Sequence, residues 1–354
     1  MSDPVFSNPL RLIDANANRA REGIRTCEDY LRFSIGQSRW SASLKHIRSD
    51  VTRLLALHFT DTELVNSRDV GRDPLSPQRN KSEPVPSGET ERSVAQRGLK
   101  RAQEALRVLE EYLRASQPQT SMQLAMHRYS LYEAEQWLLC SSAAAKVIFD
   151  STVYVLLSEA LCKQGLLATA EAVLRGGAKV VQLREKAVLD EKSLYSRAYD
   201  LLKVCCAFSA VLICNDRPDI ALMCGASGVH LGQNDLPPLD VRRLAAERLL
   251  IGRSTHSVEQ AKAAVDEERS DYIAIGSIYE TATKQGRILA GLQLAEQVSS
   301  LNLNVPVFAI GGITHTRAKE IKKAGISRIA VSAAIIADDD PETATKKLLE
   351  IMLS

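Results

Sequence analysis

Short runs rich in β-branched and other apolar residues alternate with helical stretches from Thr152 onward, and this alternation narrows the possible folds more than any other feature. The eight runs read TVYVLLS, KVVQLR, AVLIC, GVHL, LLIG, YIAIG, VPVFAI and RIAVS. Strand, helix and strand in succession pair in parallel through a right-handed crossover. Eight such units in about 200 residues predict a compact (β/α)8 barrel, the TIM-barrel form of the α/β class. The competing open sheet usually has a GxGxxG turn after its first strand, where this chain has Leu157, Ser158 and Glu159.

The first 149 residues show no convincing strand and repeat apolar residues at helical spacing instead. The first stripe consists of Ile13, Ala17, Ala20, Ile24, Cys27 and Leu31, and others follow within 44–54, 102–113 and 124–138. Steps of three and four residues place such a stripe on one face of a helix. We therefore predict an all-helical bundle over 1–149 and a barrel over 150–354, with four prolines marking 67–92 as an exposed loop.

The bundle contains an internal repeat, because RAREGIRTCEDYLR at 19–32 aligns without gaps on RAQEALRVLEEYLR at 101–114. Each copy carries a charged stripe, formed by Arg19, Glu22, Arg25 and Glu28 in the first and by Arg101, Glu104, Arg107 and Glu110 in the second. Such a stripe is either a solvated face with helical ion pairs or one wall of a charged pocket for a phosphorylated ligand. The sequence leaves both interpretations open.

The composition excludes several classes of protein. Forty-five Lys and Arg against 43 Asp and Glu give a formal charge of +2, without the basic excess of a nucleic-acid surface. The seven cysteines form no CxxC pair, which favours reduced thiols in the cytosol. The N-terminus lacks the apolar segment of a signal peptide, and no stretch is long enough to span a bilayer. We expect a cytoplasmic protein with neither nucleic acid nor membrane as a partner, and a homo-oligomer stays open.

Polar clusters follow every predicted strand after the first. They are Gln182-Leu183-Arg184-Glu185-Lys186, Asn215-Asp216, Gly232-Gln233-Asn234-Asp235, Ser254, Thr281-Ala282-Thr283-Lys284, Gly311-Gly312 and Ser332. Because the carboxyl ends of barrel strands form one rim, these clusters should meet in a single polar pocket.

Charged side chains in these clusters predict an anion and a metal ion. Arg184, Lys186 and Lys284 would repel one another unless a multiply charged anion, such as a diphosphate, lay between them. Asp216 and Asp235 follow adjacent strands and carry the oxygen ligands that Mg2+ prefers. Asp216 could alternatively only cap the helix that follows it.

A second anion site is expected across the rim. Gly311-Gly312 and the turn after Ser332 present backbone N–H groups, and barrels often hold a phosphate between these two loops. Thr281 and Thr283 could add hydroxyl groups. The pocket would then hold two phosphorylated substrates.

No nucleophile or general base is predicted. His230 and His256 flank the pocket, but His230 alternates with apolar residues and can equally be a packed core residue. No Ser–His–Asp or Cys–His arrangement is apparent, and Cys205 and Cys206 lie in a helical stretch where thiols more often pack than react.

Six motifs follow one another along the barrel half: QLREK at 182–186, CND at 214–216, GVHLGQND at 228–235, GRSTHS at 252–257, TATK at 281–284 and AIGGI at 309–313. In this order they closely resemble the thiamine-phosphate synthase family, over roughly residues 152–351. The resemblance implies a transferase of thiamine biosynthesis. With Mg2+, it would join hydroxymethylpyrimidine diphosphate to a thiazole ethyl phosphate and release diphosphate.

The resemblance also implies roles for individual residues. The pyrimidine diphosphate would contact Gln182, Arg184, Lys186, Asn215, Ser254 and Lys284, with Leu183 and Glu185 included as members of the QLREK motif. The catalytic charge would come from Arg184, Lys186 and Lys284, and the Mg2+ ligands would be Asp216 and Asp235. The thiazole phosphate would lie on Thr281, Thr283, Gly312, Ser332 and Ala333. Two residues depart from the family pattern: Glu280 replaces the usual Pro, and Ala333 replaces the usual Ser.

The implied reaction is dissociative. The bond from carbon to the diphosphate oxygen breaks, the pyrimidine stabilises the methylene cation, and the thiazole nitrogen adds to it. Stabilising the charge on the leaving group is then sufficient for catalysis. Two alternatives remain, a thiazole tautomerase-like barrel and a non-catalytic barrel that binds a phosphorylated ligand, and neither needs the Asp216, Asp235 and Arg184 set.

The N-terminal half carries DANANRAREGIRTCEDYLRF at 14–33 and RDVG at 68–71. These segments resemble a helical family that is fused to such synthases and linked to phosphorylation of hydroxymethylpyrimidine phosphate. The resemblance implies a kinase role, although the sequence contains no GxxxxGK loop.

Overall fold

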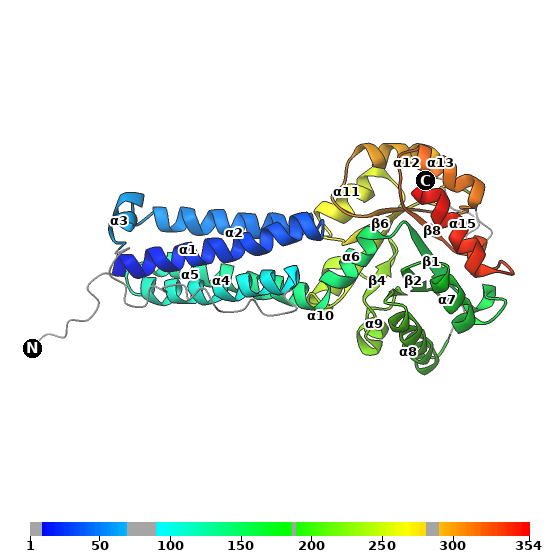
Figure 1. The fold of residues 1–354 in the computed structure, drawn as a ribbon, viewed down its shortest axis with the longest axis horizontal. Helices are drawn as coiled ribbons and strands as arrows, with labels where there is room; N and C mark the ends of the chain where they lie inside the picture. Colours follow the sequence, from blue (N-terminus) through cyan, green and yellow to red (C-terminus); the bar gives the residue numbers. More distant parts are fainter. Residues whose placement is uncertain (1–8, 69–89, 186–188, 281–289) are drawn as a thin grey trace, which may run out of the picture. The chain divides into compact units, whose positions relative to one another are not determined.

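The computed structural model describes residues 9–68, 90–185, 189–280 and 290–354, and the chain divides into two compact units at Leu138 and Leu139 (Figure 1). In the described part of the first unit, every regular element is helical. These elements are α1 (Pro9–Asp29), a π-helical turn (Tyr30–Ser34), α2 (Ser38–Ala56), α3 (Asp61–Asn66), α4 (Glu91–Leu113) and α5 (Pro118–Cys140).

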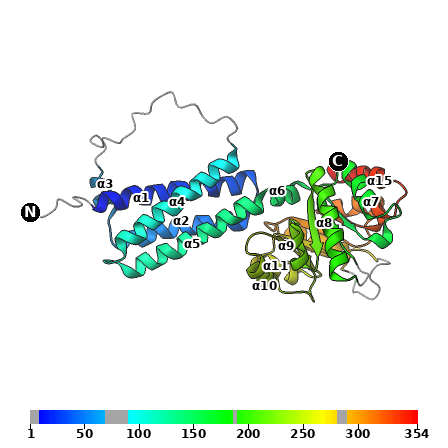
Figure 2. The ribbon, with the colours of Figure 1, turned by 90° about the horizontal axis from the view of Figure 1, so that it is seen from below.

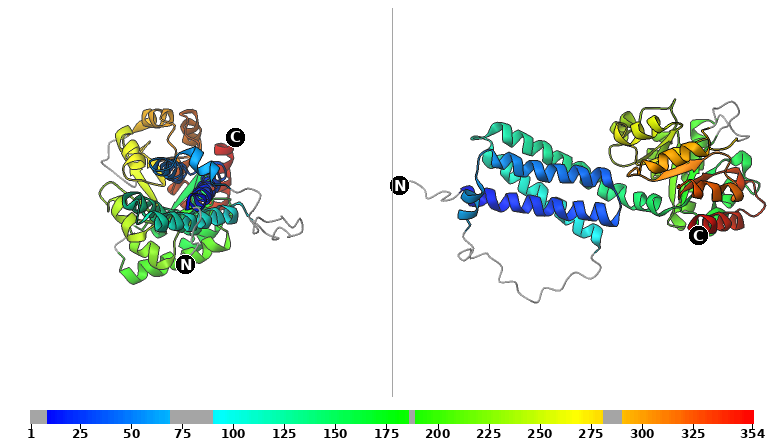
Figure 3. Two further views of the ribbon diagram at one scale, coloured as in Figure 1. Left: turned by 90° about the vertical axis from the view of Figure 1, so that its left-hand side faces the viewer. Right: turned by 90° about the horizontal axis from the view of Figure 1, so that it is seen from above.

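The four long helices of this unit lie side by side and form a bundle, as Figures 2 and 3 show from other sides. All six residues of the predicted first stripe are buried. Helices α1 and α4 approach closely where Gly23 faces Gly98, since a Cβ atom on Gly23 would clash with the carbonyl oxygen of Gly98. The predicted helical bundle is confirmed.

The charged stripe of the repeat is not a solvated face along its whole length. Glu22 and Glu104 are exposed, as such a face requires, but Glu28 and Glu110 are buried. Each buried glutamate pairs with an arginine of a neighbouring helix, which compensates for the loss of hydration.

The second unit is the predicted barrel. Its strands are β1 (Val153–Leu157), β2 (Val180–Leu183), β3 (Val211–Asn215), β4 (Gly228–Leu231), β5 (Leu250–Thr255), β6 (Tyr272–Ile275), β7 (Val307–Ile310) and β8 (Ile329–Val331). Neighbours pair in parallel and in chain order, and β8 pairs with β1. This closure confirms the (β/α)8 barrel and excludes the open sheet.

Helices surround the strands (Figure 1). They are α6 (Ser142–Asp150), a 3-10 turn (Glu159–Leu161), α7 (Leu166–Arg175), α8 (Glu191–Ala207), α9 (Pro218–Cys224), α10 (Pro238–Ala245), α11 (Val258–Asp266), α12 (Gly291–Ser300), α13 (His315–Lys323), α14 (Ala333–Ile336) and α15 (Pro341–Leu353). No helix in the described residues is both long and apolar enough to cross a membrane.

Alternate residues of each strand point into the barrel or toward the helices. Tyr154, Tyr272 and Phe308 fill the interior, and Ile148 of α6 packs against the same cluster. Helix α6 therefore belongs to the barrel unit and packs against its strands. The sequence places the domain boundary after residue 149, whereas the compact units meet eleven residues earlier, because this apolar contact ties α6 to the strands.

Candidate active site

A cavity of about 830 Å³ lies at the carboxyl ends of the strands. The predicted site residues that line it are Gln182, Arg184, Asn215, Asp216, Asp235, Ser254, Gly312, Ser332 and Ala333. They come from six different strand ends, which the closed barrel brings to one rim.

Of the six other predicted site residues, two are described and do not line this cavity, and four cannot be placed. Lys186, Thr281, Thr283 and Lys284 lie outside the described residues. Leu183 points outward into the layer between strands and helices, because it alternates with the inward-facing Gln182.

Glu185 also turns away from the cavity. Its Oε1 accepts a hydrogen bond from the backbone N–H of Glu159 at 2.9 Å, and its Oε2 lies 3.3 Å from Nη1 of Arg197. The structure thus gives Glu185 a role in holding the loops after β1 and β2 together. The QLREK motif mixes residues that face the cavity with residues that support the loop.

Asp216 and Asp235 face each other on one side of the cavity. Asp216 has a φ of 61°, a left-handed conformation that Asp tolerates better than most residues, and its N–H donates to the carbonyl of His230 at 2.9 Å. Its Oδ2 accepts a 2.5 Å hydrogen bond from the Asn215 side chain. Asp235 accepts one from the N–H of Gly232. These contacts hold both carboxyl groups at the rim.

The carboxyl pair is strained electrostatically. Burial raises the pKa of Asp216 to about 7, and the adjacent Asp235 carboxyl adds to this shift, while the positive charge of Arg184 opposes it. Two carboxylates this close repel each other unless a proton or a cation lies between them. The pair therefore suits a divalent cation.

The donor set also indicates which cation would fit. No group of three or more His, Cys, Asp or Glu side chains in the described residues is arranged to hold a metal ion. A cation between these two carboxylates would complete its coordination with water or phosphate oxygens. Mg2+ binds proteins in this way, through one or two carboxylates plus substrate phosphates.

A buried polar chain crosses the barrel under the cavity. Gln182 Nε2 donates to Tyr154 Oη at 2.6 Å, and Tyr154 Oη lies 3.1 Å from Tyr272 Oη. His230 continues the chain, with Nδ1 at 3.2 Å from Tyr272 Oη and Nε2 at 2.9 Å from Ser254 Oγ. The chain thus links Gln182 to Ser254, two residues predicted to contact the same substrate.

Tyr154 and Tyr272 are not among the site residues that the sequence predicts. The only signal in the sequence is their position, a tyrosine at an inward-facing place in each of two aliphatic strands. Burial raises the pKa of both phenols, so both stay protonated at neutral pH. Gln182 is only 1% exposed, and its Oε1 has no hydrogen-bond partner among the described residues. Gln182 itself lines the cavity, so its side chain amide lies beside the space that a ligand would fill.

The opposite wall is built from backbone. Gly312 has a φ of 63°, and a Cβ atom there would lie 2.5 Å from the carbonyl oxygen of Glu280, so only glycine fits. Ser332 Oγ donates to the carbonyl of Leu156 at 3.1 Å, and α14 begins at Ala333, where the first N–H groups of a helix lack acceptors within the helix. This wall can bind an anion without a positive side chain.

Arg317, which sequence analysis missed, also lines the cavity on this side. Its Nη1 donates to the carbonyl of Gly312 at 2.7 Å, and its guanidinium carbon lies 4.6 Å from the centre of the Tyr279 ring. Arg317 therefore braces the glycine turn.

Comparisons with known proteins cover both units. Residues 153–335 match the family described as thiamine monophosphate synthase, and residues 11–137 match the ThiD2 family. A thiamine-phosphate synthase of Synechocystis sp. is 38% identical over 339 residues, which is 96% of this chain and 95% of the relative. One from Gloeobacter violaceus is 38% identical over 341 residues, 96% of each chain.

A solved structure resembles the barrel alone. Thiamine phosphate pyrophosphorylase from Pyrococcus furiosus is 30% identical, with a TM-score of 0.52. The alignment covers 57% of this chain and 95% of that one.

Proposed function

The chain belongs to the thiamine-phosphate synthase family, and we propose that its barrel joins hydroxymethylpyrimidine diphosphate to a thiazole ethyl phosphate, giving thiamine phosphate and diphosphate. One observation carries the assignment of the site. Asp216, Asp235 and Arg184 line one cavity together with the glycine turn at Gly312 and the start of α14. The first group suits a metal diphosphate and the second suits a phosphate monoester.

The reaction transfers the pyrimidine methylene from oxygen to nitrogen. The bond from carbon to the diphosphate oxygen breaks with its electron pair, and the thiazole nitrogen forms the new bond with its own pair. Mg2+ held by Asp216 and Asp235 would supply charge neutralisation on the diphosphate. The Arg184 guanidinium adds charge-assisted hydrogen bonds to the same group. No protein nucleophile takes part in this scheme.

The remaining residues orient the two substrates. Gln182 would contact the pyrimidine, and the polar chain through Tyr154, Tyr272 and His230 holds its amide in place. The turn at Gly312 aims the thiazole phosphate. Orientation of this kind contributes to the rate because both reactants are held in reacting geometry. Lys186, Lys284, Thr281 and Thr283 remain proposed contacts on the grounds of the motifs they belong to.

An assay with both substrates tests the proposal. We expect the full chain to form thiamine phosphate when Mg2+ is present and to stop when the metal is chelated. A barrel that only rearranges the thiazole phosphate would be tautomerase-like, and one that binds both substrates without product would be a non-catalytic binder. Either result would contradict the proposed reaction.

We also propose that the bundle phosphorylates hydroxymethylpyrimidine phosphate with a nucleoside triphosphate. The match of residues 11–137 to the ThiD2 family supports this role, and the product would be the diphosphate that the barrel consumes. The test supplies the full chain with ATP, hydroxymethylpyrimidine phosphate and thiazole phosphate, without added pyrimidine diphosphate. Formation of thiamine phosphate supports the proposal, and its absence in a preparation whose barrel is active contradicts it.

A further inference from the structure

The bundle contains two copies of a helical hairpin, so its polar groups can be compared between copies. A group present in both copies serves the packing of the hairpin, and a group present in one copy needs another explanation. Each copy pairs a buried glutamate on its first long helix with an arginine on its second. Glu28 Oε2 lies 2.9 Å from Arg48 Nε, and Glu110 Oε2 lies 3.0 Å from Arg128 Nε. Because both copies keep this pair, it belongs to the packing of each helical hairpin.

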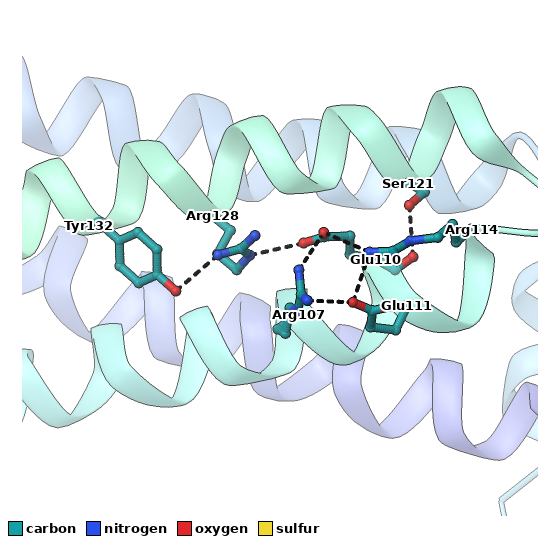
Figure 4. A network of polar contacts seen from close by, with 7 residues as sticks. All are labelled: Arg107, Glu110, Glu111, Arg114, Ser121, Arg128 and Tyr132. Atoms are coloured by element: carbon teal, nitrogen blue, oxygen red, sulfur yellow. Dashed lines mark hydrogen bonds and ion pairs between the residues drawn. The ribbon is translucent and has the colours of Figure 1, made fainter.

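Figure 4 shows the network around Glu110. Arg107 contacts Glu110 at 2.7 Å and Glu111 at 2.6 Å, and Arg114 contacts Glu111 at 2.8 Å. Arg128 reaches Tyr132 Oη at 3.0 Å. Each of these arginines therefore lies against a carboxylate or phenol of the network, as expected for a packing element.

A second polar group, the Asp14 cluster, consists of Asp14, Asn18, Arg21 and Arg68. Arg68 forms a two-pronged ion pair with Asp14, with its Nε at 2.6 Å from Oδ2 and its Nη2 at 2.8 Å from Oδ1. Asn18 donates to Asp14 Oδ1 at 3.2 Å, and Arg21 donates to Asn18 Oδ1 at 2.5 Å. The fold thus joins the two motif segments of the N-terminal half, which are 54 residues apart at this pair.

The Asp14 cluster has no equivalent in the second copy. When Arg19 is aligned with Arg101, the places of Asp14, Asn18 and Arg21 are taken by Gln96, Lys100 and Gln103. Gln103 turns inward and donates to Glu135 at 2.9 Å. In the first copy, α2 is followed by the short helix α3, and Arg68 comes shortly after it. In the second copy, α5 runs on as one helix to Cys140, and the helix that follows it, α6, belongs to the barrel unit. Packing shared by both copies does not require this cluster.

The Asp14 cluster is also costly for a helix. Asp and Asn favour helix interiors less than Ala or Leu do, yet α1 carries Asp14, Asn16 and Asn18 within five residues. Asp14 is only 4% exposed, so its carboxylate has lost its hydration. An apolar residue would pack there without that cost. Local costs of this kind concentrate at functional sites.

The cluster has a surplus of positive charge and open donors. It contains two guanidinium groups and one carboxylate, which pairs directly with Arg68. Within the described residues, Arg68 uses two of its five N–H groups on Asp14, and Arg21 uses one on Asn18. The Arg68 side chain is 41% exposed, so a ligand can reach it. Planar guanidinium donors match the oxygens of a phosphate group.

We propose that the Asp14 cluster binds a phosphate group of the bundle's substrates, with Arg21 and Arg68 as the contacts and Asp14 as the positioning residue for Arg68. The inference rests on the proposed phosphorylation activity, because it names where that reaction holds its substrate. The phosphate belongs either to a pyrimidine monophosphate or to a nucleoside triphosphate. Both ligands carry phosphate oxygens that guanidinium groups can bind, and the experiment below distinguishes between them.

The test compares arginine variants in equilibrium titrations of the full chain, with hydroxymethylpyrimidine phosphate in one arm and ATP in the other. An Arg184→Gln background reduces binding by the barrel. Arg21→Gln and Arg68→Gln should each lower the affinity for one of the two probes about 10- to 100-fold. A loss of this size, about 10- to 100-fold, is expected when a hydrogen bond to a charged group is removed. Arg107→Gln is the matched control, because it also removes a half-exposed arginine from the bundle, and its affinities should stay within about twofold.

Folding of each variant is checked without the Arg184 change, through synthase activity on supplied pyrimidine diphosphate and through the fluorescence of Trp40 and Trp137, which are buried in the bundle. The proposal is overturned if wild type binds neither probe, if Arg21→Gln and Arg68→Gln bind both normally, or if Arg107→Gln weakens binding equally. A chain that binds phosphate through Arg21 and Arg68 but transfers none from ATP supports the site and contradicts the kinase role. If Arg21→Gln and Arg68→Gln both bind the probes with normal affinity and the chain still phosphorylates its substrate, the kinase role is supported and the proposed site is contradicted.

Discussion

The barrel and the bundle place charged side chains in different ways. In the barrel, Arg184, Asp216 and Asp235 stand at strand ends and line one cavity. In the bundle, Glu28 and Glu110 are buried along helix faces, and each is compensated by arginines within the protein. The first arrangement leaves charge for a ligand, and the second uses charge for packing. A charged residue is informative about function when it lines a cavity that a ligand can enter.

The largest expected effect follows from removing one carboxylate of the barrel pair. Asp216→Asn should lower synthase activity about 100- to 1,000-fold, as loss of a main charge-stabilising contact does in other enzymes. Asp219→Asn is the control, because Asp219, on α9, pairs with Arg217 and is not among the described residues that line the cavity. Steady-state rates at saturating Mg2+ measure both. Equal losses in the two variants would show that the carboxylate pair has no special role.

The bundle should respond in stability instead. Arg128→Leu removes the one buried arginine that contacts Glu110 and leaves it the more exposed Arg107 and Arg114, so it should lower the free energy of unfolding by about 3 kcal/mol. The double variant Glu110→Leu with Arg128→Leu should recover much of this loss. Both tryptophans of the chain, Trp40 and Trp137, lie in the bundle, so urea unfolding followed by their fluorescence reports on this unit. A double variant no more stable than Arg128→Leu would contradict the packing role.

The pH dependence of metal binding tests whether the carboxylate pair of the barrel is reserved for a cation. The pKa of Asp216 is about 7 in the folded protein and 3.8 for the unperturbed group, so without metal its contribution to stability is present below pH 3.8 and lost as pH rises through 7. A metal ion must displace this proton. The apparent affinity for Mg2+ should therefore rise about tenfold per pH unit below pH 7 and level off above it. Asp235→Asn should shift this rise to lower pH in metal titrations, and an unshifted profile would contradict the coupling.

The smallest expected effect concerns the polar chain under the cavity. Tyr272→Phe removes hydrogen bonds to Tyr154 and His230 without changing the packing volume much. We expect kcat/KM for the pyrimidine diphosphate to fall about three- to tenfold, because neutral hydrogen bonds contribute modestly. Tyr199→Phe, on the outer helix α8, should leave it unchanged. If KM for the thiazole phosphate rises instead, the hydrogen-bonded chain of side chains supports the thiazole site and not the pyrimidine site.

Much of the candidate site in the barrel could be predicted because the architecture restricts where strand ends can lie. Once eight strand-and-helix units are recognised, Asn215, Asp216 and Ser254 must share a rim, whatever the loops do. The bundle offers no such rule. Its motif residues Asp14 and Arg68 meet only because α3 turns the chain back toward α1, and the loop composition does not encode that return.

The spacing of apolar residues and the order of the predicted elements can both be read from the sequence alone. They determined the number of strands, the helical N-terminal half and the edge of the barrel that carries the polar residues. Only the tertiary structure decided that Leu183 and Glu185 turn away, that Tyr154 and Tyr272 meet inside the barrel, and that α6 packs against the strands. The reason is physical. A side chain's direction and partner depend on strand twist and on residues distant in sequence, whereas the pattern of apolar residues depends on its neighbours along the chain.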